Sequence, residues 1–301
     1  MTIASLETEF GLEGQLAVVE GQGGFPLIRV ENEQASALIS VYAGQVLSYR
    51  PAGEAQDLLF VSKAAYYAEG KAIKGGIPVC WPWFGADPEN RGRPAHGFVR
   101  NRAWNLIGTA ATADGGTQVV MGLAATDETR GIWPHEFELT LEILVGRTLD
   151  VAMETRNKGG EVFSITQALH TYFLTGDIGG VSVLGLDATD YLDKTGDGGC
   201  RTQSGVVTVS AEVDRIYTGV RYPLVVEDKA LGRRIRIEAG GSSTAVVWNP
   251  WQEIAARMAD LDDDDYTRFI CVETANAADE VIQVPPGEVC RLSATYSIER
   301  L

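Results

Sequence analysis

Short apolar runs with the two-residue period of β-strands dominate this chain. Between residues 137 and 145 every odd position is apolar, whereas positions 138, 140 and 142 are Glu, Thr and Glu. This alternation is typical of an antiparallel strand with one buried face. Similar runs recur along the chain between Gly, Pro, Asn and Asp, and only residues 63–68 and 252–258 suggest short helices. We therefore expect an all-β fold, a large antiparallel β-sandwich, and not an α/β sheet.

Length and composition favour one domain. No Pro-, Gly- or Ser-rich linker divides the 301 residues, so we expect a single domain over residues 1–301. The formal net charge of -16 argues against nucleic acid or an anionic membrane as a partner. The N-terminus shows no basic stretch before an apolar segment, and no run of about eighteen apolar residues occurs. We expect a soluble, cytoplasmic monomer.

The four cysteines do not predict a disulfide framework or a zinc site. They show no C-x-x-C spacing, and each lies in or beside an apolar run: Cys80, Cys200, Cys271 and Cys290. We expect buried free thiols.

Residues 70–104 reverse the charge of the chain locally. Six positive side chains minus two negative ones give +4 in this segment: Lys71, Lys74, Arg91, Arg93, Arg100 and Arg102 against Asp87 and Glu89. Such a reversal inside an acidic protein suggests an anionic ligand. The segment also contains three tryptophans, several prolines and a Gly-Gly pair, a combination that suits a shaped pocket better than a regular element.

The run FSITQALHTYF, residues 163–173, reads as one strand with two different faces. Phe163, Ile165, Leu169 and Phe173 share the apolar face, whereas His170 lies on the other face beside small residues. That position leaves room for a ligand near the imidazole. The alternative is a solvent-facing histidine without a function.

Glu273 lies in FICVETAN, among apolar neighbours. A carboxylate in such a strand is costly unless it has a partner or a catalytic task. A structural ion pair with an arginine and an acid/base role are both open at this point. Whether His170 and Glu273 are close in space depends on the fold.

Several other functional motifs are absent or incomplete. The glycines near residue 21 precede a strand-like run, and neither a P-loop nor a G-x-S-x-G elbow occurs. In the acidic run at 260–265, Asp265 stands where a calcium loop needs Gly, so we expect a solvated acidic loop. A metal site would have to use His96, His135 and His170 with Glu273, but the close His-x-His pair is missing, and we expect no metal.

Six motifs occur in a recognisable order: KAIKGGIPVCWPWFG, AHGFVRNRAW, ALHTYF, AEVDRIY, WNPW and CVETAN. From about residue 25 to the C-terminus, the chain resembles the glucose-6-phosphate 1-epimerase branch of the aldose 1-epimerase superfamily. The resemblance implies a β-sandwich of the galactose mutarotase-like type, with the sugar in a cleft on the face of one sheet.

The resemblance also implies roles for particular residues. His170 and Glu273 match the catalytic pair, and Arg100 and Asp214 match substrate-binding residues. Lys74 occupies a position where the family often has an arginine that helps to hold the phosphate. We add two further substrate-binding residues, His96 in the basic segment and Trp81 as an apolar ring for a sugar face.

Two positions depart from the family pattern. Lys74 offers a compact charge instead of the planar fork of arginine, which changes how a phosphate is held. Ala95 stands where some relatives have a glutamine that contacts the substrate. Neither departure affects the catalytic pair.

The function that the resemblance implies is interconversion of the α and β anomers of glucose 6-phosphate, with other hexose 6-phosphates as further candidate substrates. Glu273 as carboxylate would remove the proton of the C1 hydroxyl, and His170 as imidazolium would protonate the ring oxygen. The reaction needs no metal, nucleotide or other cofactor, and the only partner is a small sugar phosphate. The alternatives are an aldose 1-epimerase for unphosphorylated sugars and a non-catalytic carbohydrate-binding protein.

Overall fold

The computed structural model describes residues 2–196 and 198–301. Within them, nine strands form one antiparallel sheet in the order β16 (Val207–Thr208), β13 (Val181–Leu184), β18 (Leu224–Asp228), β19 (Arg233–Gly240), β23 (Val289–Arg300), β9 (Leu149–Asn157), β8 (Phe137–Val145), β7 (Thr117–Ala124) and β6 (Asn105–Ala111). The alternating pattern of β8 is confirmed, since its odd positions are buried and its even positions are more exposed. That alternation gives the sheet one apolar face.

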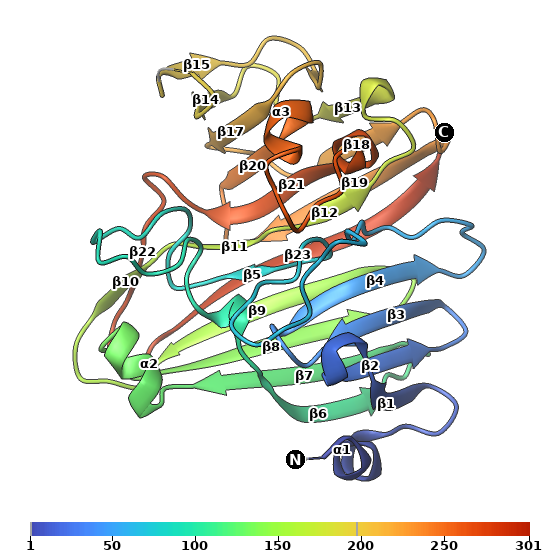
Figure 1. Ribbon diagram of the computed structural model, residues 1–301, viewed down its shortest axis with the longest axis vertical. Helices are drawn as coiled ribbons and strands as arrows, with labels where there is room; N and C mark the ends of the chain where they lie inside the picture. Colours follow the sequence, from blue (N-terminus) through green and yellow to red (C-terminus); the bar gives the residue numbers. More distant parts are fainter. Residues whose placement is uncertain (1, 197) are drawn as a thin grey trace.

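A second large sheet carries the residues of interest. Its order is β15 (Cys200–Thr202), β14 (Asp190–Asp193), β17 (Val213–Thr218), β20 (Thr244–Asn249), β21 (Phe269–Asn276), β11 (Gln167–Leu169) and β5 (Val79–Cys80), and β12 (Tyr172–Leu174) also pairs with β21. All these pairings are antiparallel. The strand β21 lies between β20 on one side and β11 and β12 on the other, which makes it an interior strand of this sheet (Figure 1).

The N-terminal strands form a separate sheet in the order β1 (Leu16–Glu20), β2 (Pro26–Glu31), β3 (Ala35–Ser40) and β4 (Gln45–Pro51). Figure 1 shows these strands lying along the β6 to β9 side of the nine-stranded sheet. One apolar core includes residues of all three sheets, such as Ile39, Ile143, Val272 and Tyr296. The predicted fold class, all β with antiparallel sheets packed on a common core, is confirmed.

The expected helices are only partly present. Residues 252–258 overlap α3 (Trp251–Ala255), but residues 63–68 form turns and not a helix. A segment of six residues is too short to be helical without support, and Ala65 and Tyr67 pack instead on an apolar cluster with Phe25. Two short helices were not predicted, α1 (Ile3–Phe10) and α2 (Asp127–Ile132). None of the helices in the described ranges is long and apolar enough to cross a membrane.

The run at 163–173 is not the continuous strand that its alternation predicts. It forms β10 (Phe163–Ile165), which pairs with β22 (Ile282–Val284), and then β11 and β12 in the eight-stranded sheet. His170 lies in the break between β11 and β12, where its N–H donates to the Pro78 carbonyl over 2.9 Å. Across the core, the Thr171 hydroxyl is hydrogen-bonded to the Tyr296 hydroxyl over 2.7 Å. These contacts fix the backbone that carries His170.

The cysteines are all free thiols. Cys80 and Cys271 are buried as expected, but Cys290 is half-buried and Cys200 is exposed. The expectation is wrong for Cys200 because β15 is the edge strand of its sheet and all its residues are exposed.

Candidate active site

His170 and Glu273 lie side by side in the eight-stranded sheet. Every residue of β21 is buried; Ile270 and Val272 face the main core, so Glu273 points to the opposite face. The His170 Nε2 and Glu273 Oε1 atoms are 3.4 Å apart, with side-chain exposures of 9% and 1%. No arginine pairs with Glu273 among the described residues. The alternatives of a solvent-facing histidine and of a structural arginine pair are therefore both wrong.

Each member of the pair keeps one polar atom free. His170 Nδ1 and Glu273 Oε2 are buried and have no hydrogen-bond partner within residues 2–196 and 198–301. A buried polar atom without a partner is costly, and native structures rarely keep one without a reason. The described part of the protein thus leaves two polar atoms of the pair unsatisfied.

Small and aromatic residues shape the surface beside the pair. Ala168, Val246 and Ala275 belong to one small apolar cluster on this face of the sheet. The His170 ring stacks on Tyr172 with 5.0 Å between centroids and meets the edge of Trp248 at 6.0 Å. Short side chains leave room over the strands, while the rings hold the imidazole in place.

Burial dominates the protonation of both groups. It raises the pKa of Glu273 well above its usual value, and the charge of Asp214 raises it further. Burial also lowers the pKa of His170 well below its usual value, followed by the effects of His96, Arg100 and Lys74. A neutral carboxyl beside a neutral imidazole is the arrangement that desolvation favours. It has the same number of protons as a carboxylate beside an imidazolium, so the two forms differ only in where one proton sits.

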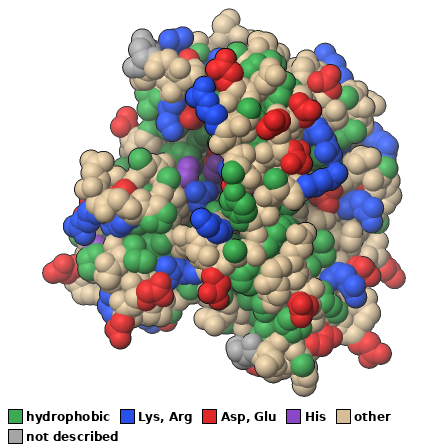
Figure 2. Space-filling model, viewed as in Figure 1, with side chains coloured by type: hydrophobic (Ala, Val, Ile, Leu, Met, Phe, Trp, Pro, Cys, Tyr) green, Lys and Arg blue, Asp and Glu red, His purple; other side chains and the backbone are tan. Residues whose placement is uncertain are grey.

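Three cations surround the pair. Arg100 lies in the short 3-10 turn Val99–Asn101, donates to the Ala95 carbonyl over 3.1 Å, and has no carboxylate within 4 Å in the described part of the chain. Lys74 Nζ lies 3.5 Å from Asp260 Oδ2, and Lys194 Nζ lies 3.5 Å from Asp214 Oδ2. Figure 2 shows histidine side chains at the bottom of a hollow, with Lys and Arg side chains around it. The hollow therefore combines an acid/base pair with positive charge.

His96 reaches the same place from the basic segment. Its ring lies between Phe84, at 4.9 Å, and His170, at 5.6 Å between centroids. Burial, helped by the charge of Arg100, lowers the pKa of His96 to about 3. The next residue must be glycine, because a Cβ on Gly97 would lie 1.8 Å from the Trp81 carbonyl oxygen. This close approach brings His96 over the sheet.

The prediction that Trp81 binds the substrate is wrong. Trp81 is completely buried, and its indole N–H donates to the Thr155 hydroxyl over 3.0 Å. Its ring packs against Trp133 and Phe137 in the core. The aromatic residues that lie beside the histidines include Tyr172, Trp248 and Phe84, none of which was predicted to be part of the site.

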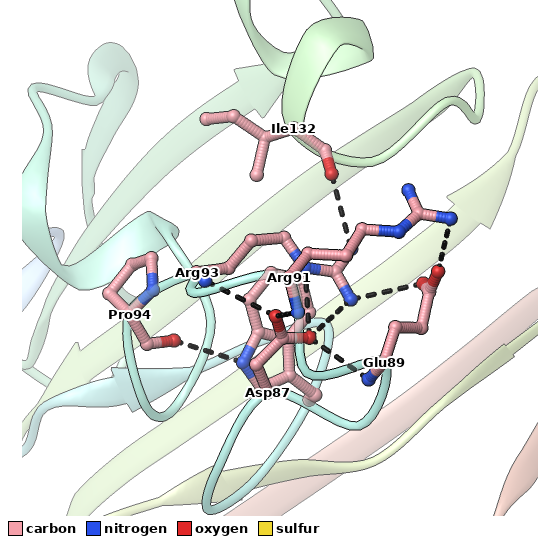
Figure 3. A network of polar contacts seen from close by, with 7 residues as sticks. Asp87, Glu89, Arg91, Arg93, Pro94 and Ile132 are labelled. Carbon is pink, nitrogen blue, oxygen red and sulfur yellow. Dashed lines mark hydrogen bonds and ion pairs between the residues drawn. The ribbon is translucent and has the colours of Figure 1, made fainter.

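Most of the charge in residues 70–104 has a structural use. The Asp87 carboxylate accepts hydrogen bonds from the Arg93 guanidinium and from the backbone N–H of Glu89 and Arg91, as Figure 3 shows. Arg93 also donates to Glu89 and to the Ile132 carbonyl. Arg102 Nη2 lies 3.4 Å from Glu128 Oε1. Of the six cations, Lys74 and Arg100 are the two whose charges act on His170.

The remaining candidates for other chemistry lie elsewhere. The His135 ring packs on Trp133 and Phe163. No group of three or more His, Cys, Asp or Glu side chains that could hold a metal occurs in the part of the chain described. Asp265 is buried and accepts from the Ser62 hydroxyl over 2.9 Å, so the acidic run is not solvated throughout.

Lys194 is a further charged residue of the site that sequence reasoning missed. It follows β14, a strand that was not predicted, and its charge acts on His96 and on Glu273. The only sequence signal was the apolar pair Tyr191 and Leu192 between Asp190 and Asp193, which is too short to define a strand. Its place in the site depends on the pairing of β14 with β17.

Comparison with known proteins gives consistent matches over almost the whole chain. Residues 26–297 match the Aldose 1-epimerase family. A putative glucose-6-phosphate 1-epimerase of Escherichia coli strain K12 is 38% identical over 254 residues, which cover 84% of this chain and 84% of the relative. A protein of the same name from Salmonella typhimurium strain LT2 is 34% identical over 278 residues, 91% of this chain and 90% of that one.

Solved structures show the same fold. The crystal structure of a putative mutarotase from Salmonella typhimurium superposes with a TM-score of 0.86 at 32% identity, covering 95% of this chain and 97% of that one. A galactose mutarotase-like protein from Clostridium acetobutylicum matches with a TM-score of 0.73 at 16% identity, covering 95% of this chain and 98% of that one. The second match supports the fold alone, and the expected galactose mutarotase-like architecture is confirmed.

Proposed function

Since the chain belongs to the aldose 1-epimerase family, we propose that it interconverts the α and β anomers of glucose 6-phosphate. The observation that carries the proposal is the contact of 3.4 Å between His170 Nε2 and Glu273 Oε1, with one polar atom of each left free. The cations around the pair and the names of the relatives favour a phosphorylated sugar.

The reaction requires two proton transfers in opposite directions. Glu273 as carboxylate removes the proton of the C1 hydroxyl while His170 as imidazolium protonates the ring oxygen, and the bond between C1 and the ring oxygen breaks. The open-chain aldehyde turns about its C1–C2 bond. Ring closure from the other face returns both protons, so the enzyme ends in its starting state.

The charge of the substrate supports this assignment of acid and base. Arg100 and Lys74 lower the pKa of His170, which opposes the imidazolium form. A phosphate dianion near these two side chains offsets their charge and makes a protonated His170 easier to form. We assign the phosphate to Lys74 and Arg100, and the sugar hydroxyls to Asp214 and His96.

The experiment that tests the proposal compares two sugars. We expect exchange NMR to show enzyme-dependent anomer exchange for glucose 6-phosphate, with a catalytic efficiency that falls at high salt because the phosphate contacts are screened. Equal, salt-independent rates for glucose and glucose 6-phosphate would instead identify an epimerase of unphosphorylated sugars. Saturable sugar binding without any exchange would identify a carbohydrate-binding protein.

A further inference from the structure

Lys194 is held firmly against Asp214. Its backbone N–H donates to the Asp214 carbonyl over 2.9 Å, and its ammonium lies 3.5 Å from the Asp214 carboxylate. The preceding residue, Asp193, is buried and accepts hydrogen bonds from the Thr195 N–H and hydroxyl. These contacts fix the backbone of Lys194, whose side chain is 45% exposed and directed to Asp214.

Two carboxylates face this cleft. Asp214 on β17 pairs with Trp248 on β20, and Glu273 lies on the next strand, β21. The pKa of each carboxyl is raised, first by burial, and the charge of Asp214 raises that of Glu273 further. When two carboxylates share a poorly solvated site, one of them tends to take up a proton near neutral pH.

Lys194 opposes this uptake at both carboxylates. Its charge lowers the pKa of Asp214 and that of Glu273, and its effect on Glu273 exceeds that of Arg100. Lys74 contacts a different carboxylate, that of Asp260. The charge of Asp193, which pairs with Arg215 across the strands, also raises the pKa of Asp214. The other titratable groups that interact with Glu273 or Asp214 are His170, Cys80, Cys271, Tyr172, Tyr296 and Glu212.

We propose that Lys194 is a positioning residue of the active site, which acts through its ion pair with Asp214 to favour the ionised form of both carboxyl groups of the cleft. The inference rests on the proposed epimerase function. Asp214 accepts hydrogen bonds from sugar hydroxyls at both of its oxygens only when it is ionised, and Glu273 must be ionised to act as a base. Without Lys194, the two requirements conflict.

The test is the pH profile of Lys194→Met. We expect the acidic limb of kcat/KM to move to higher pH by about one unit, because removal of the cation makes the carboxyls easier to protonate. The shift should be equal for glucose 6-phosphate and for any exchange of glucose, and Lys194→Arg should restore the limb. Lys158→Met is the matched control, since Lys158 is 48% exposed and paired with Glu138 in the other sheet.

Two results would overturn the proposal. One is an acidic limb that does not move in Lys194→Met. The other is a salt-dependent loss of kcat/KM for glucose 6-phosphate alone, without a shift of the acidic limb. That result would make Lys194 a phosphate ligand. A measurement that does not depend on enzymatic activity is the ¹³C NMR titration of the Asp214 carboxyl. We expect its midpoint to move to higher pH in Lys194→Met even if neither sugar is a substrate. An unchanged midpoint contradicts the proposal.

Discussion

His170 and Glu273 contact each other through one polar atom of each side chain, and the second polar atom of each side chain has no hydrogen-bond partner in the described residues. Nε2 lies 3.4 Å from Oε1, while Nδ1 and Oε2 are buried without a partner in the described residues. A pair that served stability alone would satisfy these atoms, because an unpaired buried polar group is costly. The arrangement instead fits two groups that exchange protons with a bound sugar.

We expect that Glu273 does not stabilise the folded protein and that its burial serves the reaction. We expect Glu273→Gln to unfold at an equal or higher denaturant concentration than the wild type, because burial opposes the ionisation of Glu273 and an amide, which never ionises, avoids that cost. Urea unfolding monitored by circular dichroism measures the midpoint denaturant concentration. A clear loss of stability would show that Glu273 has a structural partner in the folded protein.

Arg100 should decide the preference for a phosphorylated sugar. We expect Arg100→Met to raise KM for glucose 6-phosphate about tenfold or more, since an ion pair with a phosphate is lost, with little effect on exchange of glucose. Arg91→Met is the control, because Arg91 is exposed and pairs with Glu89. Equal effects on both sugars would place Arg100 outside the phosphate site.

A substitution at Lys74 should have the opposite effect on KM for glucose 6-phosphate. We expect Lys74→Arg to lower KM for glucose 6-phosphate several-fold, because the planar guanidinium can bind two phosphate oxygens at once. Steady-state kinetics at two salt concentrations measures the change. An increased KM would show that the contact of Lys74 with Asp260 requires the compact ammonium group.

The protonation of His170 should depend on bound anion. Its pKa is depressed by burial and then by His96, Arg100 and Lys74, so the free imidazole stays neutral as the pH falls below the usual histidine value. Inorganic phosphate near the two cations offsets part of this effect, and we expect the pKa of His170 to rise. Imidazole ¹⁵N NMR titration with and without phosphate measures it, and an unchanged or lower pKa would contradict the proposed phosphate site.

Arg93 should matter for stability although its neighbour Arg91 does not. Arg93 is nearly buried, bridges Asp87, Glu89 and the Ile132 carbonyl, and lies 4.3 Å from the Trp83 ring centroid. We expect Arg93→Met to lower Tm by several degrees, because Asp87 loses its charged partner, whereas Arg91→Met leaves Tm almost unchanged. Equal shifts in thermal unfolding would mean that the network in Figure 3 is not structural.

Periodicity predicted the strands well where one face of a sheet meets the core. The run at 137–145 formed a strand as expected, because the alternation alone determines which face is buried. It failed at 163–173, where the strand changes partners from β22 to β21 and β5. No local pattern records such a change, since it depends on strands distant in sequence.

The site was predictable to the extent that ordered motifs carried it. His170 and Glu273 are in contact and the charge of Arg100 acts on both, in line with the family resemblance, whereas the net charge of residues 70–104 alone did not show which of the six cations lie near the pair. The prediction that Trp81 binds the sugar was wrong because the sequence does not distinguish a tryptophan of the core from one of a sugar site. Lys194 was missed because its place depends on the pairing of β14 with β17.

The most direct test of the acid/base account is exchange NMR of glucose 6-phosphate with the wild type and Glu273→Gln at equal concentration. We expect the wild type to accelerate the exchange of the two anomers and Glu273→Gln to reduce that acceleration at least about a hundredfold, the usual contribution of one proton transfer. Exchange that Glu273→Gln leaves intact, or that the wild type does not accelerate, would contradict the account.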